Sequence, residues 1–352
     1  MYITLFVLAW LVAMAPALQD PRADASQQPL LSAPTPVNFS VGFSLQSSYG
    51  AAAVIFEYEN GEIQTHARVH HGDDAYQEVM ARLSLASSRH LAPPYEDMEE
   101  YFNDQPRRAV RTALKKLGLP ASHDVGVLAG VIKRLRSDLE SNYHIHISEA
   151  VFTSTHLLAL YQDDLMDLAD HAGIKYVTPK RQFKPILWET AAAYAGYGLG
   201  LCEHWQDEER CQEETHNLPH IDLLAIHYSR TALTTGLVPV KTAVGAFEPD
   251  PLHVENFTLG SDAIENYLNP EDYWAGVKDV LLNVMCRFPG YPGPEKIMMT
   301  GDMVHSEDFM EFVKKTIEQH KGFIPPILCE DAQTAAAKGA AELMRRGPAP
   351  WS

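Results

Sequence analysis

Two stretches of the sequence carry side chains that could bind a ligand or take part in catalysis. The first is the turn SLQSSYG at residues 44–50, which is short, small and polar. Turns of this kind often hold a phosphate, because their backbone N–H groups and hydroxyls point at the anion. This turn has no carboxylate and almost no glycine, both of which a working phosphate and magnesium site normally needs. The residues therefore predict either a nucleotide-binding turn or the remnant of one.

The second stretch, LCEHWQDEERCQEETHNLPHID at residues 201–222, is rich in cysteine, histidine and acidic residues. Its candidate metal ligands are Cys202, His204, Cys211, His216 and His220. A zinc site needs about four ligands in a definite geometry, and the close cysteine pair of a zinc ribbon is absent. We therefore predict a solvated loop closed by a disulfide between Cys202 and Cys211, with no bound metal, and keep metal binding as the alternative.

Other signatures of catalysis are absent or weak. Ser154 and Ser229 lack the Gly-x-Ser-x-Gly elbow of a hydrolase. The sequence contains neither a Walker-type glycine-rich loop nor the glycine fingerprint of dinucleotide-binding folds. His144 and His146 precede an expected strand, and we predict that they are polar residues at a strand edge rather than metal ligands.

The N-terminal residues are typical of a secreted chain. Residues 1–17 contain a short apolar run and small residues at a cleavage spacing, which predicts a signal peptide rather than a membrane anchor. Residues 18–36 are predicted to be a flexible leader. We expect a protein of the secretory pathway, in the endoplasmic reticulum lumen or outside the cell, with no membrane span after cleavage. The lack of a Lys-Asp-Glu-Leu-type tail favours export.

The cysteines and two sequons fit an oxidising compartment. Cys286 and Cys329 would form a second disulfide beside the one in the acidic segment. Asn38 and Asn256 open Asn-x-Ser/Thr triplets and are therefore candidate glycosylation sites.

Composition limits the size of the fold and the class of partner. The 352 residues, 46% of them apolar, can build one large or two medium domains. A formal net charge of −18 argues against a nucleic-acid partner, because phosphate backbones require clustered Lys and Arg. A nucleotide site is local and is not excluded by this charge.

The pattern of apolar and turn residues predicts an α/β protein. Residues 37–63 form a strand, the polar turn and a second strand that ends at the turn Asn60-Gly61. Residues 189–201, ETAAAYAGYGLGL, form a helix of small residues that suits close packing against a neighbour. The other expected elements are helices over most of 74–140, a buried strand at 147–154, a helix at 157–174, a strand at 175–179, a hairpin at 220–240, a helix at 271–285, a strand and turn at 295–304, and helices at 306–320 and 331–346.

This order of segments resembles the nucleotide-binding domain of the heat-shock 70 kDa chaperones, within the actin-like ATPase superfamily. The resemblance extends over about 300 residues. The segments that carry it are residues 41–63 for the first phosphate hairpin, 131–174 for the helix–strand–helix before the connecting motif, ETAAAYAGYGLG for the connecting helix, LLAIHYSRTAL for the second phosphate hairpin, EKIMMTGDMVHSEDF for the adenosine motif and DAQTAAAKGAAELM for the final helix.

The resemblance implies an actin-like ATPase fold of two lobes, each with a β-sheet flanked by helices, and a nucleotide cleft between them. We place the first lobe at residues 37–188 and the second at 189–346, with a shortened insertion in the second and a tail at 347–352. The sequence shows no β-rich segment after the last helix, so the chaperones' peptide-binding domain is not expected.

The resemblance also assigns residues to the nucleotide cleft. The positions that correspond to nucleotide-binding residues of the family are Gly42, Ser44, Gln46, Ser47, Ser48, Tyr49, His227, Ser229, Arg230, Thr231, Gly301 and Asp302. The family's metal-holding aspartates fall on Ser44 and His227, and its catalytic glutamate falls on Trp188. Glu189, one residue further on, is the candidate substitute acid.

These departures decide the expected function. Phosphoryl transfer depends on positioning and on magnesium, and both metal-holding carboxylates are missing. We therefore expect ATPase activity that is weak or lost, weak binding of ATP or ADP at most, and no firm magnesium site. An unknown protein would then be the partner. The alternatives are an active but divergent ATPase that uses Glu189 or Asp302, and a secreted scaffold or metal-binding protein on the same fold.

Overall fold

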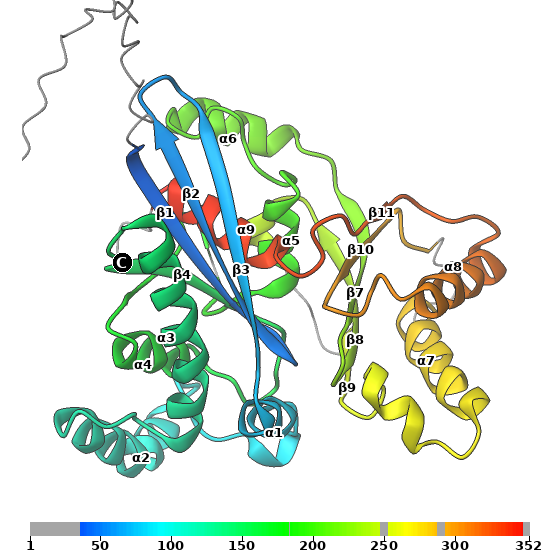
Figure 1. The fold of residues 1–352 in the computed structure, drawn as a ribbon, viewed down its shortest axis with the longest axis horizontal. Helices are drawn as coiled ribbons and strands as arrows, with labels where there is room; N and C mark the ends of the chain where they lie inside the picture. Colours follow the sequence, from blue (N-terminus) through cyan, green and yellow to red (C-terminus); the bar gives the residue numbers. More distant parts are fainter. Residues whose placement is uncertain (1–35, 183, 247–252, 287–292, 348–352) are drawn as a thin grey trace, which may run out of the picture. The chain divides into compact units, whose positions relative to one another are not determined.

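Two β-sheets, each flanked by helices, make up the fold (Figure 1). The structure is a computed structural model and describes residues 36–182, 184–246, 253–286 and 293–347. The predicted signal peptide, nearly all of the leader and most of the tail lie outside the described residues. The prediction of an α/β fold with two such sheets is confirmed. The boundary between lobes at residue 188 stays a prediction.

The first sheet combines an antiparallel meander with parallel strands. Its order is β3-β2-β1-β4-β5, with β6 paired to β4. Strand β2 is antiparallel to its neighbours β1 and β3, and β4 lies parallel to β1, β5 and β6. The strands are β1 (Pro36–Leu45), β2 (Tyr49–Tyr58), β3 (Ile63–His71), β4 (Glu149–Ser154), β5 (Lys175–Val177) and β6 (Leu187–Trp188).

The second sheet repeats the same plan with the order β11-β10-β7-β8-β9. Strands β7, β8 and β9 are antiparallel neighbours, whereas β10 lies parallel to β7 and to β11. The strands are β7 (Ile221–Tyr228), β8 (Leu233–Val240), β9 (His253–Asn256), β10 (Lys296–Thr300) and β11 (Ile327–Leu328). The two sheets are thus the same topology built twice.

Each sheet is covered by its own set of helices, with which it shares an apolar core. Helices α1 (Asp74–Leu83), α3 (His123–Tyr143) and α4 (Gln162–His171) share one apolar core with the first sheet. Helices α7 (Pro270–Met285) and α8 (Glu307–Lys321) share another with the second sheet. The 3-10 turns are η1 (Ala86–Ser88), η2 (Ala243–Gly245) and η3 (Ser261–Asn266).

Helices α5 (Glu189–Gly196) and α9 (Ala335–Arg345) lie between the sheets and share a third core with both (Figure 1). Their backbones approach so closely that a Cβ on Gly339 would stand 1.7 Å from the carbonyl oxygen of Ala192. A Cβ on Gly196 would meet the carbonyl oxygen of Ala335 at 2.0 Å. The sequence prediction that α5 packs closely through small residues is confirmed.

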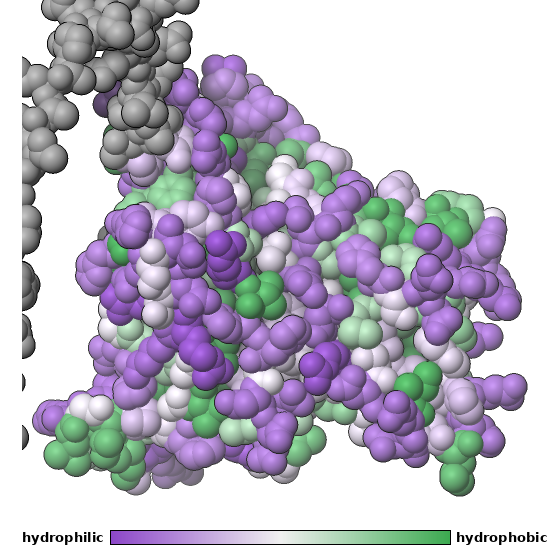
Figure 2. Space-filling view, viewed as in Figure 1, coloured by the Kyte–Doolittle hydropathy of each residue, from purple (hydrophilic) through white to green (hydrophobic). Residues whose placement is uncertain are grey.

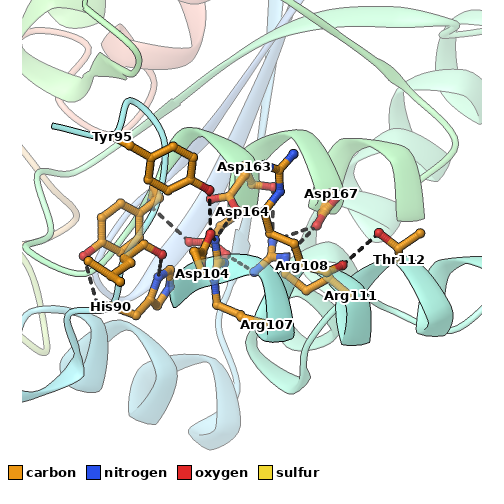
Figure 3. Close-up of polar contacts among 12 residues, drawn as sticks. His90, Tyr95, Asp104, Arg107, Arg108, Arg111, Thr112, Asp163, Asp164 and Asp167 are labelled. Atoms are coloured by element: carbon orange, nitrogen blue, oxygen red, sulfur yellow. Dashed lines mark hydrogen bonds and ion pairs between the residues drawn. The ribbon is translucent and has the colours of Figure 1, made fainter. Parts of the chain in front are cut away.

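Helix α2 (Met98–Lys116) is attached mainly by charge (Figure 3). Of its 19 residues, only Asp104 and Arg111 are buried. The Arg111 guanidinium lies 2.7 Å from carboxylate oxygens of both Asp164 and Asp167 on α4. Paired in this way, the buried charges satisfy one another.

The acidic segment differs in part from its prediction. A disulfide does join Cys202 and Cys211, with Cα atoms 5.2 Å apart, and that prediction is confirmed. The rest of the segment is not a loop, since α6 (Glu208–Asn217) is a helix whose start is capped by the Asp207 side chain. The acidic composition that suggested a solvated loop instead supplies a capping residue and first-turn carboxylates, which favour a helix start.

Two further expectations were wrong. Cys286 and Cys329 are free thiols, so they form no second disulfide. The helix expected from residue 157 begins only at Gln162, with Tyr161 as its cap. Strand β9 was not expected, because four residues are too few for a period-2 pattern to stand out.

Candidate functional site

The polar turn between β1 and β2 is held in place by hydrogen bonds from a buried tyrosine. The Tyr76 hydroxyl donates to the carbonyl oxygens of Gln46, at 2.6 Å, and of Tyr49, at 3.0 Å. Tyr76 is fully buried, and burial raises the pKa of its phenol, so the hydroxyl stays a donor. The turn is thereby fixed with its side chains directed at the second sheet.

The turn between β7 and β8 is closed by its own serine. Ser229 Oγ accepts hydrogen bonds from the backbone N–H groups of Thr231, at 3.3 Å, and Ala232, at 3.1 Å. A hydroxyl that folds back in this way stabilises a tight turn without glycine. His227 stands two residues earlier, opposite Thr300 in the parallel register of β7 and β10.

Buried hydrogen bonds join the two turns directly. Ser47 Oγ lies 2.8 Å from His227 Nε2 and 2.6 Å from Ser229 Oγ. On the other side of the imidazole ring, His227 Nδ1 lies 2.9 Å from Glu189 Oε1. Ser47 and Ser229 are wholly shielded from solvent, and His227 is 3% exposed. The two sheets are therefore linked by direct hydrogen bonds between buried polar side chains.

Glu189 has a second partner in the first turn. The hydrogen-bonding pattern assigns the Gln46 amide with its nitrogen toward Glu189, 2.9 Å from Oε2, and its oxygen accepting from Ser44 Oγ at 2.5 Å. Glu189 is the first residue of α5 and is buried. Its carboxyl group therefore lies among hydrogen-bond donors at a helix N-terminus. The predicted substitute acid thus lies in the cleft, fully engaged by Gln46 and His227.

Asp302 joins the same two turns by a separate route. Both of its carboxylate oxygens lie 3.2 Å from Ser48 Oγ, and Oδ1 accepts from the Arg230 backbone N–H at 3.2 Å. The Arg230 guanidinium points elsewhere and pairs with Asp262 at 3.2 Å. Of this pair of predicted nucleotide-binding residues, only Asp302 contributes its side chain to the cleft.

Three further predicted nucleotide-binding residues, Gly42, Gly301 and Tyr49, are closely packed against other parts of the fold. Gly42 gives room to α9, because a Cβ there would stand 2.3 Å from the Ala341 backbone nitrogen. Gly301 has φ +110°, and a Cβ there would meet the Tyr228 carbonyl oxygen at 2.0 Å. Tyr49 is fully buried, and burial, with added repulsion from Glu189 and Asp302, holds the pKa of its phenol well above the ordinary value.

The space left at this place is small. A cavity of about 10 Å³ lies beside the chain of hydrogen bonds, lined by residues that include Glu189, His227 and Thr300. This is room for about one water molecule. A triphosphate and a hydrated metal ion do not fit without separating the turns.

Ser47, His227 and Glu189 have the connectivity of a nucleophile, a general base and an orienting acid. Hydrogen-bonded contacts of 2.8 and 2.9 Å between them meet the distance condition for such a set. The reaction also needs access for a substrate carbonyl, and Ser47 is completely buried. In this closed arrangement the three residues therefore serve as a structural link.

The histidine and cysteine set in the acidic segment does not come together as a metal site. Cys202 and Cys211 are consumed by their disulfide, and His204 pairs with Glu214. Among the described residues, the one group of side chains spaced to hold a metal ion is elsewhere, at His156, His253 and Glu255. Sequence reasoning missed this group, since 99 residues separate His156 from Glu255 and no motif connects them.

Comparisons with known proteins add little to this geometry. No family model matches the sequence, and no curated protein matches it. Among solved structures, the chain is similar to the ethanolamine utilization protein EutJ from Carboxydothermus hydrogenoformans, with 10% sequence identity and a TM-score of 0.42, over 88% of this chain and 92% of that one. A likeness this weak carries no argument about function. In the described part of the chain, no helix has the length and apolar character to cross a membrane.

Proposed function

We propose that this protein is a pseudo-ATPase of the actin-like fold, related to the nucleotide-binding domain of heat-shock 70 kDa chaperones. It holds its two sheets together through its own side chains, binds ATP or ADP weakly at most, and acts through contacts with another protein. The observation that supports this proposal is the buried chain of hydrogen bonds from Ser47 through His227 to Glu189.

The replaced carboxylates support the same proposal. Magnesium prefers carboxylate and water oxygens, and the residues in place of the family's two aspartates are Ser44 and His227. Ser44 bonds the Gln46 side chain, and His227 bonds Ser47 and Glu189. Neither residue offers a negatively charged ligand to a metal ion.

A second candidate is an active but divergent ATPase, and one observation favours it. Glu189 and Asp302 are buried acids beside the two turns, where a metal ion would be needed. Opening of the turns would free both carboxylates from their present donors. The third candidate is a secreted scaffold or metal-binding protein, and the closed cleft is as compatible with it as with the first candidate.

Phosphate release from ATP tests the first two candidates against each other. The full chain, incubated with ATP and Mg²⁺, is expected to release no phosphate above a heat-denatured control. Release by the native chain that disappears in Glu189→Gln or Asp302→Asn would contradict the proposal and establish the divergent ATPase. The matched control is Asp262→Asn, which removes an acid exposed at 56% that pairs with the Arg230 guanidinium in the second turn.

An exposed apolar surface supports a protein partner. Met98, Phe102 and Val110 on α2, and Leu117 directly after it, are exposed at 62%, 63%, 59% and 75%. Their spacing places them on one side of the helix. Apolar side chains gather over α2 at the lower left of Figure 2. Contiguous exposed apolar residues commonly mark a surface that binds another protein.

The secretory pathway remains part of the proposal. The Cys202–Cys211 disulfide supports an oxidising compartment, and Asn38 is exposed near the start of β1, where a glycan has room. Expression in a eukaryotic secretory host is expected to give a product whose mobility shifts on glycosidase treatment. Asn38→Gln should remove that shift in whole or in part, and an unshifted wild-type product would contradict the glycosylation.

A further inference from the structure

Three side chains meet across the cleft, beside the chain of hydrogen bonds but outside it. His156 Nδ1 lies 2.9 Å from Glu255 Oε1, and His253 Nε2 lies 3.4 Å from the same oxygen. One ligand atom from each residue falls within 4.8 Å of the other two. Two imidazoles and a carboxylate are therefore grouped around one point.

The fold explains why these residues meet. His253 and Glu255 are two positions apart on β9, so their side chains lie on the same face of the strand. His156 follows the end of β4 in the first sheet. Its ring packs at 4.5 Å from the Trp188 ring and at 4.4 Å from the His253 ring. Each sheet thus supplies part of the group.

Glu255 is unusually placed for a carboxylate. Its side chain is 6% exposed, and among the described residues Oε2 has no hydrogen-bond partner. The group is therefore a shielded carboxyl with one oxygen that no described residue satisfies. A buried, unsatisfied oxygen of this kind indicates a cation or a water that completes it.

We propose that His156, His253 and Glu255 bind a Zn²⁺ ion that joins the two sheets. Two histidines and one glutamate are a donor set that zinc accepts in proteins, with water in the fourth position. Donor atoms around a tetrahedral zinc ion are about 3.4 Å apart, close to the separations of Glu255 from the two imidazoles. The water-sized cavity in the cleft is lined by His156 and His253, which gives the fourth ligand a place.

The proposed zinc site is separate from the residues assigned to the nucleotide cleft. None of its three ligands takes part in the chain of hydrogen bonds through His227, and none belongs to the acidic Cys and His segment. The ion replaces nothing in the catalytic machinery of an ATPase. It fastens the first sheet to the second at one more point, through His156 on one side and His253 and Glu255 on the other.

Zinc titration of the full chain tests this proposal. The protein is purified without a histidine tag, stripped with a chelator, and titrated with Zn²⁺ by calorimetry. We expect one equivalent to bind with a dissociation constant of about 1 μM or tighter. Glu255→Gln, which keeps the volume of the side chain, and His156→Ala should each weaken binding by at least about tenfold. The matched control is His123→Ala, because His123 is exposed at 79% and lies on α3.

Two further measurements make the result independent of folding defects. Circular dichroism establishes that each variant keeps its secondary structure, and Co²⁺ substitution gives a visible spectrum whose intensity reports a tetrahedral site. Absence of stoichiometric zinc binding by the wild-type chain would overturn the proposal. Binding that is equally tight in Glu255→Gln, His156→Ala and wild type would also overturn it, since the ion would then lie elsewhere.

Discussion

At the scale of single residues, His227 determines the character of the cleft. Its imidazole bonds to Ser47 on one sheet and to Glu189 at the start of α5, and all three side chains are buried. A neutral histidine has one nitrogen that donates and one that accepts, so it can bond a carboxylate such as Glu189 on one side, which an ionised aspartate cannot do, and a hydroxyl on the other. The imidazole therefore cross-links the first turn to the start of α5.

His227→Ala should lower the free energy of unfolding by about 2–3 kcal/mol. The change leaves Glu189 buried with fewer donors and removes one of the two hydrogen-bond partners of Ser47. Urea denaturation measures the effect. His146→Ala is the matched control, since His146 is exposed at 78%, and it should change stability by less than about 0.5 kcal/mol. A loss in His227→Ala no larger than in the control would show that the cross-link does not stabilise the fold.

At the scale of elements, α9 is held to the rest of the fold by close backbone contact and by a charged cluster at its end. Arg345 lies 3.0 Å from Glu57 on β2 and 2.7 Å from Glu342. Arg346 adds a second contact to Glu342 at 2.7 Å. The small residues of α9 permit the contact, and the arginines orient its last turn.

Gly339→Ala should destabilise the protein by about 1–3 kcal/mol, because the added Cβ would overlap the carbonyl oxygen of Ala192 on α5. Gly130 in α3 provides the matched control, since a Cβ there meets only the Arg134 side chain at 4.0 Å. Gly130→Ala should instead stabilise by about 0.5–1 kcal/mol, as expected for an open helical position. Thermal unfolding of the two variants compares them. Equal effects would contradict the close packing of α5 on α9.

The charged cluster at the end of α9 predicts that the stability of the protein falls at acidic pH. Burial raises the pKa of the Glu342 carboxyl, but Arg345 and Arg346 outweigh burial and hold it below the ordinary value of 4.5. A lowered folded-state pKa means that the stabilisation is complete above the unfolded-state pKa and is lost as the pH falls through the folded-state pKa. Melting temperatures between pH 7 and pH 3 should therefore fall more steeply in wild type than in Glu342→Gln. Parallel curves would contradict this role of Glu342.

At the scale of the whole molecule, the order of the segments predicts much of the fold. The hairpin at Asn60-Gly61 and the second hairpin lie where their patterns indicate, because each depends on neighbours in sequence. The small-residue helix α5 begins at Glu189 as expected but ends at Gly196, five residues before the expected end. The contacts across the cleft do not follow from any local pattern. Ser47 and His227 are 180 positions apart, and only the assembled sheets bring them together.

The same limit applies to the residues that the sequence reading missed. Residues 208–217 contain many acids, which suggested solvent exposure, yet those acids favour the start of α6. His253 and Glu255 lie on a four-residue strand whose identity depends on pairing with β8. A single sequence carries no signal for such tertiary pairing, so the proposed zinc ligands could not be found from it.

The most direct test of the closed cleft is calorimetric titration of the full chain with ATP, with and without Mg²⁺. We predict either no detectable binding or a dissociation constant above about 1 mM that Mg²⁺ does not change, because the turns are joined by their own side chains. Micromolar binding that requires Mg²⁺ would contradict the account. It would show that the link through Ser47, His227 and Glu189 opens and that a carboxylate in the cleft holds the metal.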